Sequence, residues 1–348
     1  MYSIRRFPLV QNKAGAGIIV ERARAVPRVG HPRNLLEAAT ELRLLIVGGS
    51  GHVSGTLARA AVAQGHDVWT VTRGLRALPE GVRPILVDRE EPERFAEAVR
   101  EADTEWDMVV DCICYRPEAM RQDIALFGGL TDHFAFVSTD FVYDPARRRF
   151  PQPEDAEHYC VGGGGAMEYG LNKRLCEREL MEADTGGMQW TVFRPCHVYG
   201  GTSLLGCLPE HGRDPRLIER LRQGEPLRLL GGGHFLQQPV LCSDLAEMIL
   251  SAEGVKRAYG EVFNAAGPDI VESRRYYEIV AETLRVGLTV EEALVSEYLE
   301  RRPEQAPFAC HRIYDMAKAR DCGLKTPATP IELGVRSHAL AMASLKDG

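Results

Sequence analysis

The chain has 348 residues, of which 45% are hydrophobic and 26% are charged, and its net charge is -7. This is the composition of a globular protein that is long enough for one large domain with a smaller lobe. The acidic balance argues against a nucleic-acid binder, which usually carries a basic surplus. No apolar run approaches the roughly 18 residues of a membrane helix. We therefore expect a cytoplasmic protein whose partners include neither a membrane nor a nucleic acid.

The first 41 residues differ from the rest of the chain. They hold seven Lys or Arg against three Glu, and Pro8, Pro27 and Pro32 interrupt any regular pattern. A signal peptide would need a continuous apolar core, which is missing. We expect a flexible or lightly packed extension, with an organellar transit peptide as the alternative. The nine cysteines show no paired spacing of metal ligands, so we expect reduced thiols and no metal site.

From Leu42 onward, short apolar strands alternate with helical segments. Strands are predicted at 42–47, 67–72, 83–87, 107–111, 133–138 and 189–194, and helices at 52–64, 92–102 and 167–183. This alternation is typical of βαβ units, and right-handed crossovers then give an α/β fold with a doubly wound parallel sheet of the Rossmann type. Ligands of such sheets bind in a crevice at the carboxyl ends of the strands.

After Gly200 the pattern loosens. Helices are predicted at 243–252, 273–284 and 331–343, between segments rich in Gly and Pro. We predict that residues 42–200 form mainly the Rossmann domain. Residues 201–348 then form mainly a smaller C-terminal substrate lobe, part of which returns to the Rossmann core.

A glycine-rich turn follows the first predicted strand and precedes the first predicted helix. Gly48 and Gly51 have the spacing of a turn whose backbone approaches a pyrophosphate, and the helix start would supply amide groups and a favourable dipole. We therefore predict a dinucleotide cofactor. Ser54 stands at the third position of the motif and Gly55 follows it, so we expect looser packing of helix against strand there. We also expect Gly51 to need backbone angles that other residues avoid.

The ends of the second and third strands bear on the choice between NAD and NADP. An acid after the second strand would hold a ribose 2′-hydroxyl and repel a 2′-phosphate. This chain has Arg73 there, which favours NADP if it pairs with the phosphate, although a solvated loop arginine is the alternative. Asp88 closes the third strand, where it could reach the adenine amino group or simply cap the strand.

Tyr169 and Lys173 lie four residues apart and therefore on one face of a predicted helix. A phenol with a pKa near 10 is a poor base at neutral pH. A neighbouring ammonium would lower that pKa and allow proton exchange with a substrate hydroxyl. Thr139 follows the fifth strand, so it would face the same crevice and could hydrogen-bond the reacting oxygen.

Together these motifs resemble the extended short-chain dehydrogenases/reductases, the NAD-dependent epimerase/dehydratase family. The resemblance covers residues 42–334 and rests on segments that occur in family order: Leu45-Ile-Val-Gly-Gly-Ser-Gly51, Phe136-Val-Ser-Thr-Asp-Phe-Val-Tyr143, Tyr169–Lys173, Arg194-Pro-Cys-His-Val-Tyr-Gly200, Ser243-Asp-Leu-Ala246 and Asp315–Leu324. It implies that Tyr169 is the acid and base, that Lys173 binds the nicotinamide ribose and lowers the tyrosine pKa, and that Thr139 positions the reacting oxygen.

Two departures from the family pattern bear on the substrate. Asp140 and Phe141 stand where sugar-nucleotide dehydratases carry an Asp-Glu pair, so the sequence disfavours a dehydratase, and Asp140 alone also suits the reductases. Gln237 stands where family members often carry an arginine that grips a diphosphate, and an amide cannot replace that charged contact. Either a basic residue such as Arg213, Arg216 or Arg312 holds the diphosphate, or the substrate lacks one. His197 could project into the substrate lobe or be structural.

The sequence leaves three functions open. The first is an epimerase of a sugar or sugar nucleotide, which works through a transient ketone. The second is a reductase or dehydrogenase of a similar substrate. The third is a dinucleotide-binding regulator or RNA-associated protein without catalysis, which the intact set of Thr139, Tyr169 and Lys173 disfavours. We expect a sugar-like small molecule as substrate, and we consider a homodimer as the assembly.

Overall fold

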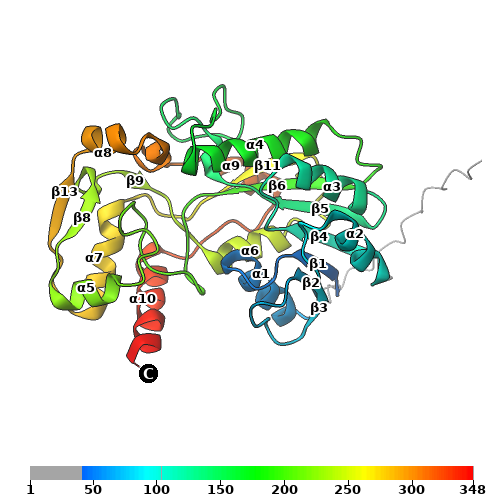
Figure 1. The fold of residues 1–348 in the computed structure, drawn as a ribbon, viewed down its shortest axis with the longest axis horizontal. Coiled ribbons are helices and arrows are strands. Elements are labelled where there is room, and N and C mark those ends of the chain that lie inside the picture. Colours follow the sequence, from blue (N-terminus) through cyan, green and yellow to red (C-terminus); the bar gives the residue numbers. More distant parts are fainter. Residues whose placement is uncertain (1–40, 103, 348) are drawn as a thin grey trace, which may run out of the picture. The chain divides into compact units, whose positions relative to one another are not determined.

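A parallel sheet of seven strands forms the frame of the computed structural model, which describes residues 41–102 and 104–347 (Figure 1). The strands are β1 (Arg43–Val47), β2 (Asp67–Thr72), β3 (Val82–Leu86), β4 (Trp106–Asp111), β5 (Thr131–Val137), β6 (Gln189–Pro195) and β11 (Glu261–Ala265). Their order is β11-β6-β5-β4-β1-β2-β3, and every neighbouring pair is parallel. The predicted doubly wound α/β fold is confirmed.

Helices cover both faces of this sheet. The side chains of β1 show why its sequence is apolar throughout, because Leu44 and Ile46 enter one core cluster while Leu45 and Val47 enter the other. The first cluster includes residues of α1 (His52–Ala63) and α6 (Cys242–Leu250). The second includes residues of α2 (Pro92–Glu101), α3 (Pro117–Phe127) and α4 (Gly165–Glu182).

A third core cluster belongs to the C-terminal half. It lies between the parallel pair β8 (Leu227–Leu230) and β13 (Val290–Ala293) and the helices α5 (Leu217–Gln223), α7 (Ser273–Leu284) and α10 (Ile331–Asp347), which Figure 1 shows apart from the large sheet. The remaining elements are β7 (Val198–Tyr199), β9 (Leu236–Gln237), β10 (Val240–Leu241), β12 (Val271–Glu272), α8 (Val295–Arg301), α9 (Ala317–Cys322) and the 3-10 turns η1 (Asp140–Val142), η2 (Gly231–Gly233), η3 (Lys256–Ala258) and η4 (Pro303–Phe308).

The domain boundary near residue 200 stays a prediction. Strand β11 comes from beyond that boundary and pairs with β6 at the sheet edge, so the two halves share one sheet. The predicted N-terminal extension lies outside the described residues apart from Glu41. Among the helices that the structure describes, none is both long and apolar enough to cross a membrane.

A buried ion pair fastens α4 to the sheet. Arg194 in β6 donates from Nε and Nη2 to the two carboxylate oxygens of Glu177 in α4, at 2.9 and 2.7 Å. The same carboxylate accepts a hydrogen bond from the Ser138 hydroxyl at the end of β5, at 2.7 Å. Both charged groups are shielded from solvent, so each depends on the other for its solvation.

We expect Arg194→Met to lower the free energy of unfolding by about 3–5 kcal/mol, because it removes the fully buried cation of Glu177 and leaves only the partly exposed Arg174, at 2.9 Å, to pair with this carboxylate. Urea denaturation measures the change. The matched control is Arg178→Met, since Arg178 forms an exposed pair with Glu182 on the same helix at 3.2 Å. That change should cost less than about 1 kcal/mol. Similar losses in the two variants would contradict the importance given to the buried pair.

Candidate active site

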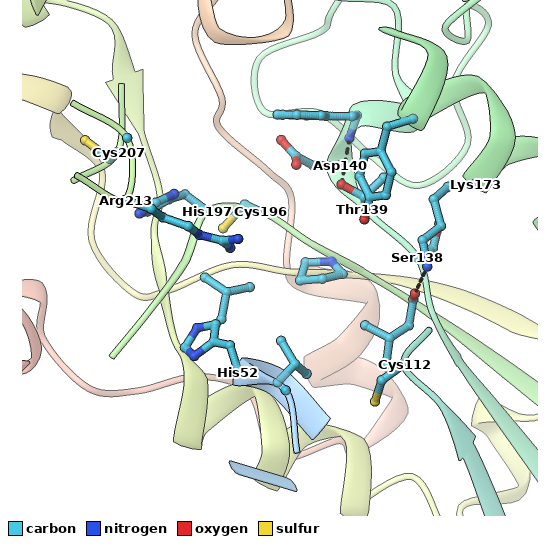
Figure 2. A pocket seen from close by; sticks show the side chains of 18 of the residues that line it. His52, Cys112, Ser138, Thr139, Asp140, Lys173, Cys196, His197, Cys207 and Arg213 are labelled. Carbon is cyan, nitrogen blue, oxygen red and sulfur yellow. Dashed lines mark hydrogen bonds between the residues drawn. The ribbon is translucent and has the colours of Figure 1, made fainter. Parts of the chain in front are cut away.

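A cavity of about 510 Å³ opens at the carboxyl ends of β1, β4, β5 and β6 (Figure 2). This is the edge at which doubly wound sheets bind their ligands. The C-terminal half contributes Gly206, Cys207, Gly212, Arg213, Phe308 and Arg312 to its walls. Helix α4 contributes Tyr169 and Lys173. The structure therefore brings both halves of the chain to one cavity.

The glycine turn after β1 uses its glycines differently from our prediction. Gly48 and Gly49 have φ of +125° and +113°, which side chains disfavour, and a Cβ on Gly49 would lie 2.6 Å from the Thr70 side chain. Gly51 has φ of -82°, so the expectation that it needs unusual backbone angles is wrong. A Cβ on Gly51 would meet only the Ser54 hydroxyl, at 3.1 Å. The absence of a side chain at Gly51 leaves open space beside the cavity, where a ligand can approach the backbone.

The start of α1 can hold a pyrophosphate. Gly51, His52, Val53 and Ser54 line the cavity, and the first amide groups of a helix have no acceptor within it. These amides and the helix dipole favour an anion, which fits the phosphates of a dinucleotide. The looser packing expected at Ser54 stays a prediction. Ser54 is 3% exposed, and a Cβ on Gly48 would lie 3.0 Å from the Ser54 Cβ.

A close contact between α4 and η1 brings Tyr169 and Thr139 to the same wall. A Cβ on Gly170 would lie 2.1 Å from the Phe141 carbonyl oxygen, so only glycine permits this approach. Gly170 follows Tyr169 directly, and Thr139 is the N-cap of η1. The Tyr169 ring lies 6.3 Å from the rings of both Phe141 and Tyr115. The part of the cavity beside Tyr169 therefore has aromatic walls.

The Lys173 ammonium binds the carboxyl end of β5. Its Nζ donates to the Val137 carbonyl oxygen at 2.7 Å and lies 4.8 Å from the centre of the Tyr115 ring. We expected Lys173 to lower the pKa of Tyr169, but withdrawal of the hydroxyl from solvent raises this pKa to about 12, and the charge of Asp140 adds to the rise. In this geometry Tyr169 keeps its proton at neutral pH.

Asp140 lines the cavity, but its carboxylate is already engaged. Arg312 donates to its two oxygens from Nε at 2.8 Å and from Nη2 at 3.1 Å, and Tyr314 donates a hydrogen bond from its hydroxyl. Arg148 lies 3.6 Å away. Although burial opposes it, the charge of Arg312, followed by that of Arg148, holds the pKa of Asp140 below its usual value. Asp140 therefore suits a positioning role, and its predicted catalytic role stays a prediction.

The other predicted substrate residues fall in different places. His197 and Arg312 line the cavity. Gln237 is not among the lining residues; it is 1% exposed, and its amide donates to the Ser273 hydroxyl at 2.6 Å. Ser273 at the start of α7 thus holds the Gln237 amide, and the substrate role of Gln237 stays a prediction.

Arg73 and Asp88 stand at the carboxyl ends of β2 and β3, outside the lining of the cavity. Arg73 Nη1 lies 3.8 Å from an Asp88 carboxylate oxygen; the Arg73 side chain is largely open to solvent, and the Asp88 side chain is partly buried. Each remains accessible to a ligand, and each is partly neutralised by the other.

Among the residues around the site that the sequence did not single out are His52, Tyr115, Arg148 and Phe308. Only His52 carried a local signal, since it follows Gly51 directly. Asp111, Cys114 and Asp123 also lie close enough together to hold a metal ion. Arg89, however, donates to both carboxylates, so a guanidinium already occupies the space between them.

Comparison with known proteins agrees with this geometry. The model of the NAD dependent epimerase/dehydratase family matches residues 44–266. The 2'-dehydrokanamycin reductase of Streptomyces kanamyceticus is 28% identical over 247 residues, which is 70% of this chain and 67% of the relative. A chloroplast stem-loop binding protein of Arabidopsis thaliana is 23% identical over 261 residues, which is 70% of this chain and 64% of the relative.

Among solved structures, an epimerase of Methanothermobacter thermautotrophicus has a TM-score of 0.73 at 15% identity, over 88% of this chain and 94% of the epimerase. The seven-stranded sheet, the glycine turn and the helix that carries Tyr169 and Lys173 all lie within or beside the matched residues 44–266. The chain therefore belongs to the NAD-dependent epimerase/dehydratase family, as an NAD(P)-dependent enzyme of the extended short-chain dehydrogenase/reductase type.

Proposed function

We propose that this enzyme interconverts a secondary alcohol and a ketone on a sugar-like substrate, as an epimerase that passes through a transient ketone. The observation that carries the proposal is the meeting of Thr139, Tyr169 and Lys173 in one cavity with the amide end of α1. Such a cavity can hold a dinucleotide and a substrate carbon beside a proton donor. The bound nicotinamide would accept and return the hydride.

Each of the three side chains has a proposed task. The Tyr169 oxygen takes the proton of the substrate hydroxyl when the ketone forms and returns it when the alcohol forms again. The Thr139 hydroxyl holds the same substrate oxygen. Lys173 leaves the Val137 carbonyl to bind the nicotinamide ribose, where its charge favours the tyrosinate. The rings of Phe141 and Tyr115 would flank the reacting carbon beside Tyr169.

A reductase is the second candidate. A hydroxyl with a pKa raised to about 12 is protonated at neutral pH and can donate to a ketone oxygen directly. An epimerase needs the same oxygen first as a base. The reductase of Streptomyces kanamyceticus named above supports this alternative. The cytoplasmic location and the homodimer stay predictions.

We further propose NADP as the preferred cofactor, with NAD as the alternative. Arg73 is exposed at the end of β2 and could turn to a 2′-phosphate. Asp88, 3.8 Å away, could instead contact the adenine amino group, and it competes for the same guanidinium. The balance between these two contacts decides the selectivity.

Gly51→Val should abolish cofactor binding in a protein that keeps its melting temperature, because the side chain fills the space beside the start of α1. Isothermal titration with NAD and NADP measures the binding. Gly49→Ala is the matched comparison. It should lower stability by about 1–3 kcal/mol or more, since it combines a disfavoured φ with an overlap against Thr70. Wild-type cofactor affinity in Gly51→Val would refute the assignment of this turn.

Arg73→Ala should weaken NADP binding by about 1–3 kcal/mol and leave NAD nearly unaffected, because only NADP carries the 2′-phosphate. Titration calorimetry with both cofactors tests this. Arg83→Ala is the control, since Arg83 pairs with Asp67 near the amino end of the same two strands. Equal losses for both cofactors in the Arg73 variant, or no loss, would remove the argument for NADP.

Tyr169→Phe should lower turnover by about 10²–10⁴-fold, the usual contribution of general acid–base catalysis, while fold and cofactor affinity survive. Lys173→Met should weaken both turnover and cofactor binding. Turnover is measured on sugars and nucleotide sugars found active in a screen. Net oxidation of NAD(P)H indicates a reductase. Inversion of a sugar centre without cofactor consumption, followed by NMR, indicates an epimerase.

The control for this prediction is Tyr298→Phe, because Tyr298 lies on α8 outside the cavity lining. It should keep wild-type turnover. A Tyr169→Phe enzyme that retains more than about a tenth of wild-type turnover would contradict the proposed proton transfer.

A further inference from the structure

The walls of the cavity carry more positive than negative charge. Lys173, Arg213 and Arg312 line it, and Asp140 is the only carboxylate among the lining residues that the structure describes. The Asp140 carboxylate is shared between Arg312 and Arg148. Arg213 and Lys173 therefore face no carboxylate among the lining residues, and the cavity favours an anionic ligand.

Arg312 presents a fixed donor. Its Nε and Nη2 bind Asp140, which orients the guanidinium. Its Nη1 is buried and has no hydrogen-bond partner among residues 41–102 and 104–347. The rings of Phe141 and Phe308 flank the group at 5.1 and 6.0 Å. Because a buried donor without an acceptor is costly, this nitrogen is arranged for an acceptor that a ligand brings.

His52 has the same lack of partners. Both of its ring nitrogens are buried, and neither has a side-chain partner among the described residues, while the Val198 backbone lies close enough to act on its pKa. Burial lowers the pKa of His52 to about 4, and the charge of Arg213 adds to this effect. The ring is therefore neutral and has one N–H to donate.

His197 lies among these cationic groups. Burial holds its pKa well below the usual value, and the charges of Arg312, Arg213 and His52 act in the same direction. No carboxylate is among these influences. The imidazole is consequently neutral and stands in a region of positive potential.

Arg213 completes the group. Its backbone has φ of 52°, and its amide donates to the Gly206 carbonyl oxygen at 3.3 Å. None of the described residues forms an ion pair with its guanidinium, which therefore keeps its full charge for a ligand. Figure 2 shows Arg213, His197 and His52 on one side of the cavity, with Thr139 and Lys173 on the other.

We infer that Arg213, Arg312, His197 and His52 form an anion subsite that holds an acidic group of the substrate, a carboxylate or a phosphate. This inference rests on the proposed function, since it places the acidic group of the substrate in the cavity that Tyr169 also lines. The substrate class is then a sugar acid or sugar phosphate. Guanidinium and imidazole donors match the oxygens of both groups.

The subsite differs in place from the position of Gln237. That side chain is held by Ser273 and lies outside the lining of the cavity. The pyrophosphate of the cofactor is a second source of negative charge, because His52 begins α1. The experiment must therefore separate substrate binding from cofactor binding.

The test uses two probes with the same ring, D-glucuronate and D-glucose, titrated into the full chain saturated with NADPH. Calorimetry should show that glucuronate binds at least tenfold more tightly than glucose, and inorganic phosphate should compete with it. Arg213→Gln should reduce the preference for glucuronate at least tenfold and leave the affinity for NADPH unchanged. Because binding is measured, the outcome is independent of the turnover test of Tyr169.

Arg216→Gln is the matched control, since Arg216 lies three residues away, pairs with Glu219 at 3.3 Å and does not line the cavity. It should keep the wild-type preference. Equal affinity for the two probes, or no measurable binding of either, would overturn the inference. An Arg213→Gln variant that loses NADPH affinity but keeps the preference would also overturn it, because the cations would then serve the cofactor.

Discussion

The buried carboxylate of Asp140 is the group on which the geometry of the site depends. It lies in η1, just after β5, and it is bound by Arg312 and Tyr314 from a segment some 170 residues further along the chain. Arg148 donates to the Asp140 backbone carbonyl at 3.0 Å as well. Removing one partner of such a cluster leaves a buried charge, which costs several kcal/mol. The C-terminal segment is thereby held against the loop that carries Thr139.

The same cluster explains the character of the wall around Tyr169. Arg312 lies over the rings of Phe141 and Phe308, and Phe141 approaches the ring of Tyr169 edge to face. Phe141 stands where a dehydratase of the resembled type carries a glutamate. An aromatic ring cannot abstract a proton, but it packs well against a guanidinium. Phe141 therefore supplies a packing surface and no base, which is compatible with the proposed interconversion of an alcohol and a ketone.

The sequence predicted those parts of the fold that have strong local signals. The predicted bounds of β2 and α7 agree with the structure, and the predicted sheet is confirmed. Helix α3 was missed, although Pro117 at its first turn is a helix-start signal. The short strands β7 to β10 could not be predicted, because two to four residues carry no recognisable alternation.

Within the site, local spacing was enough to place Tyr169, Lys173 and Thr139 near one another. It could not show that Lys173 turns to the Val137 carbonyl, or that Gln237 is held by Ser273. Each of these contacts joins two residues 36 positions apart. Local spacing cannot show such contacts, because they depend on how helices pack on loops. The role of Gly51 was misjudged for a related reason, since a motif gives the residue type and not its backbone angles.

Strand β11, the last strand of the large sheet along the chain, determines when the sheet can be completed during synthesis. β11 pairs with β6, and its Asn264 accepts a hydrogen bond from Tyr143 at 2.6 Å and donates one to the Gln152 carbonyl at 2.9 Å. A nascent chain cannot form these contacts until the ribosome has released Ala265. Until then β6 presents an open edge, to which other chains can add a strand. Translation thus passes through a stage in which the incomplete chain already contains the glycine turn and Tyr169 but exposes the edge of β6 to neighbouring chains.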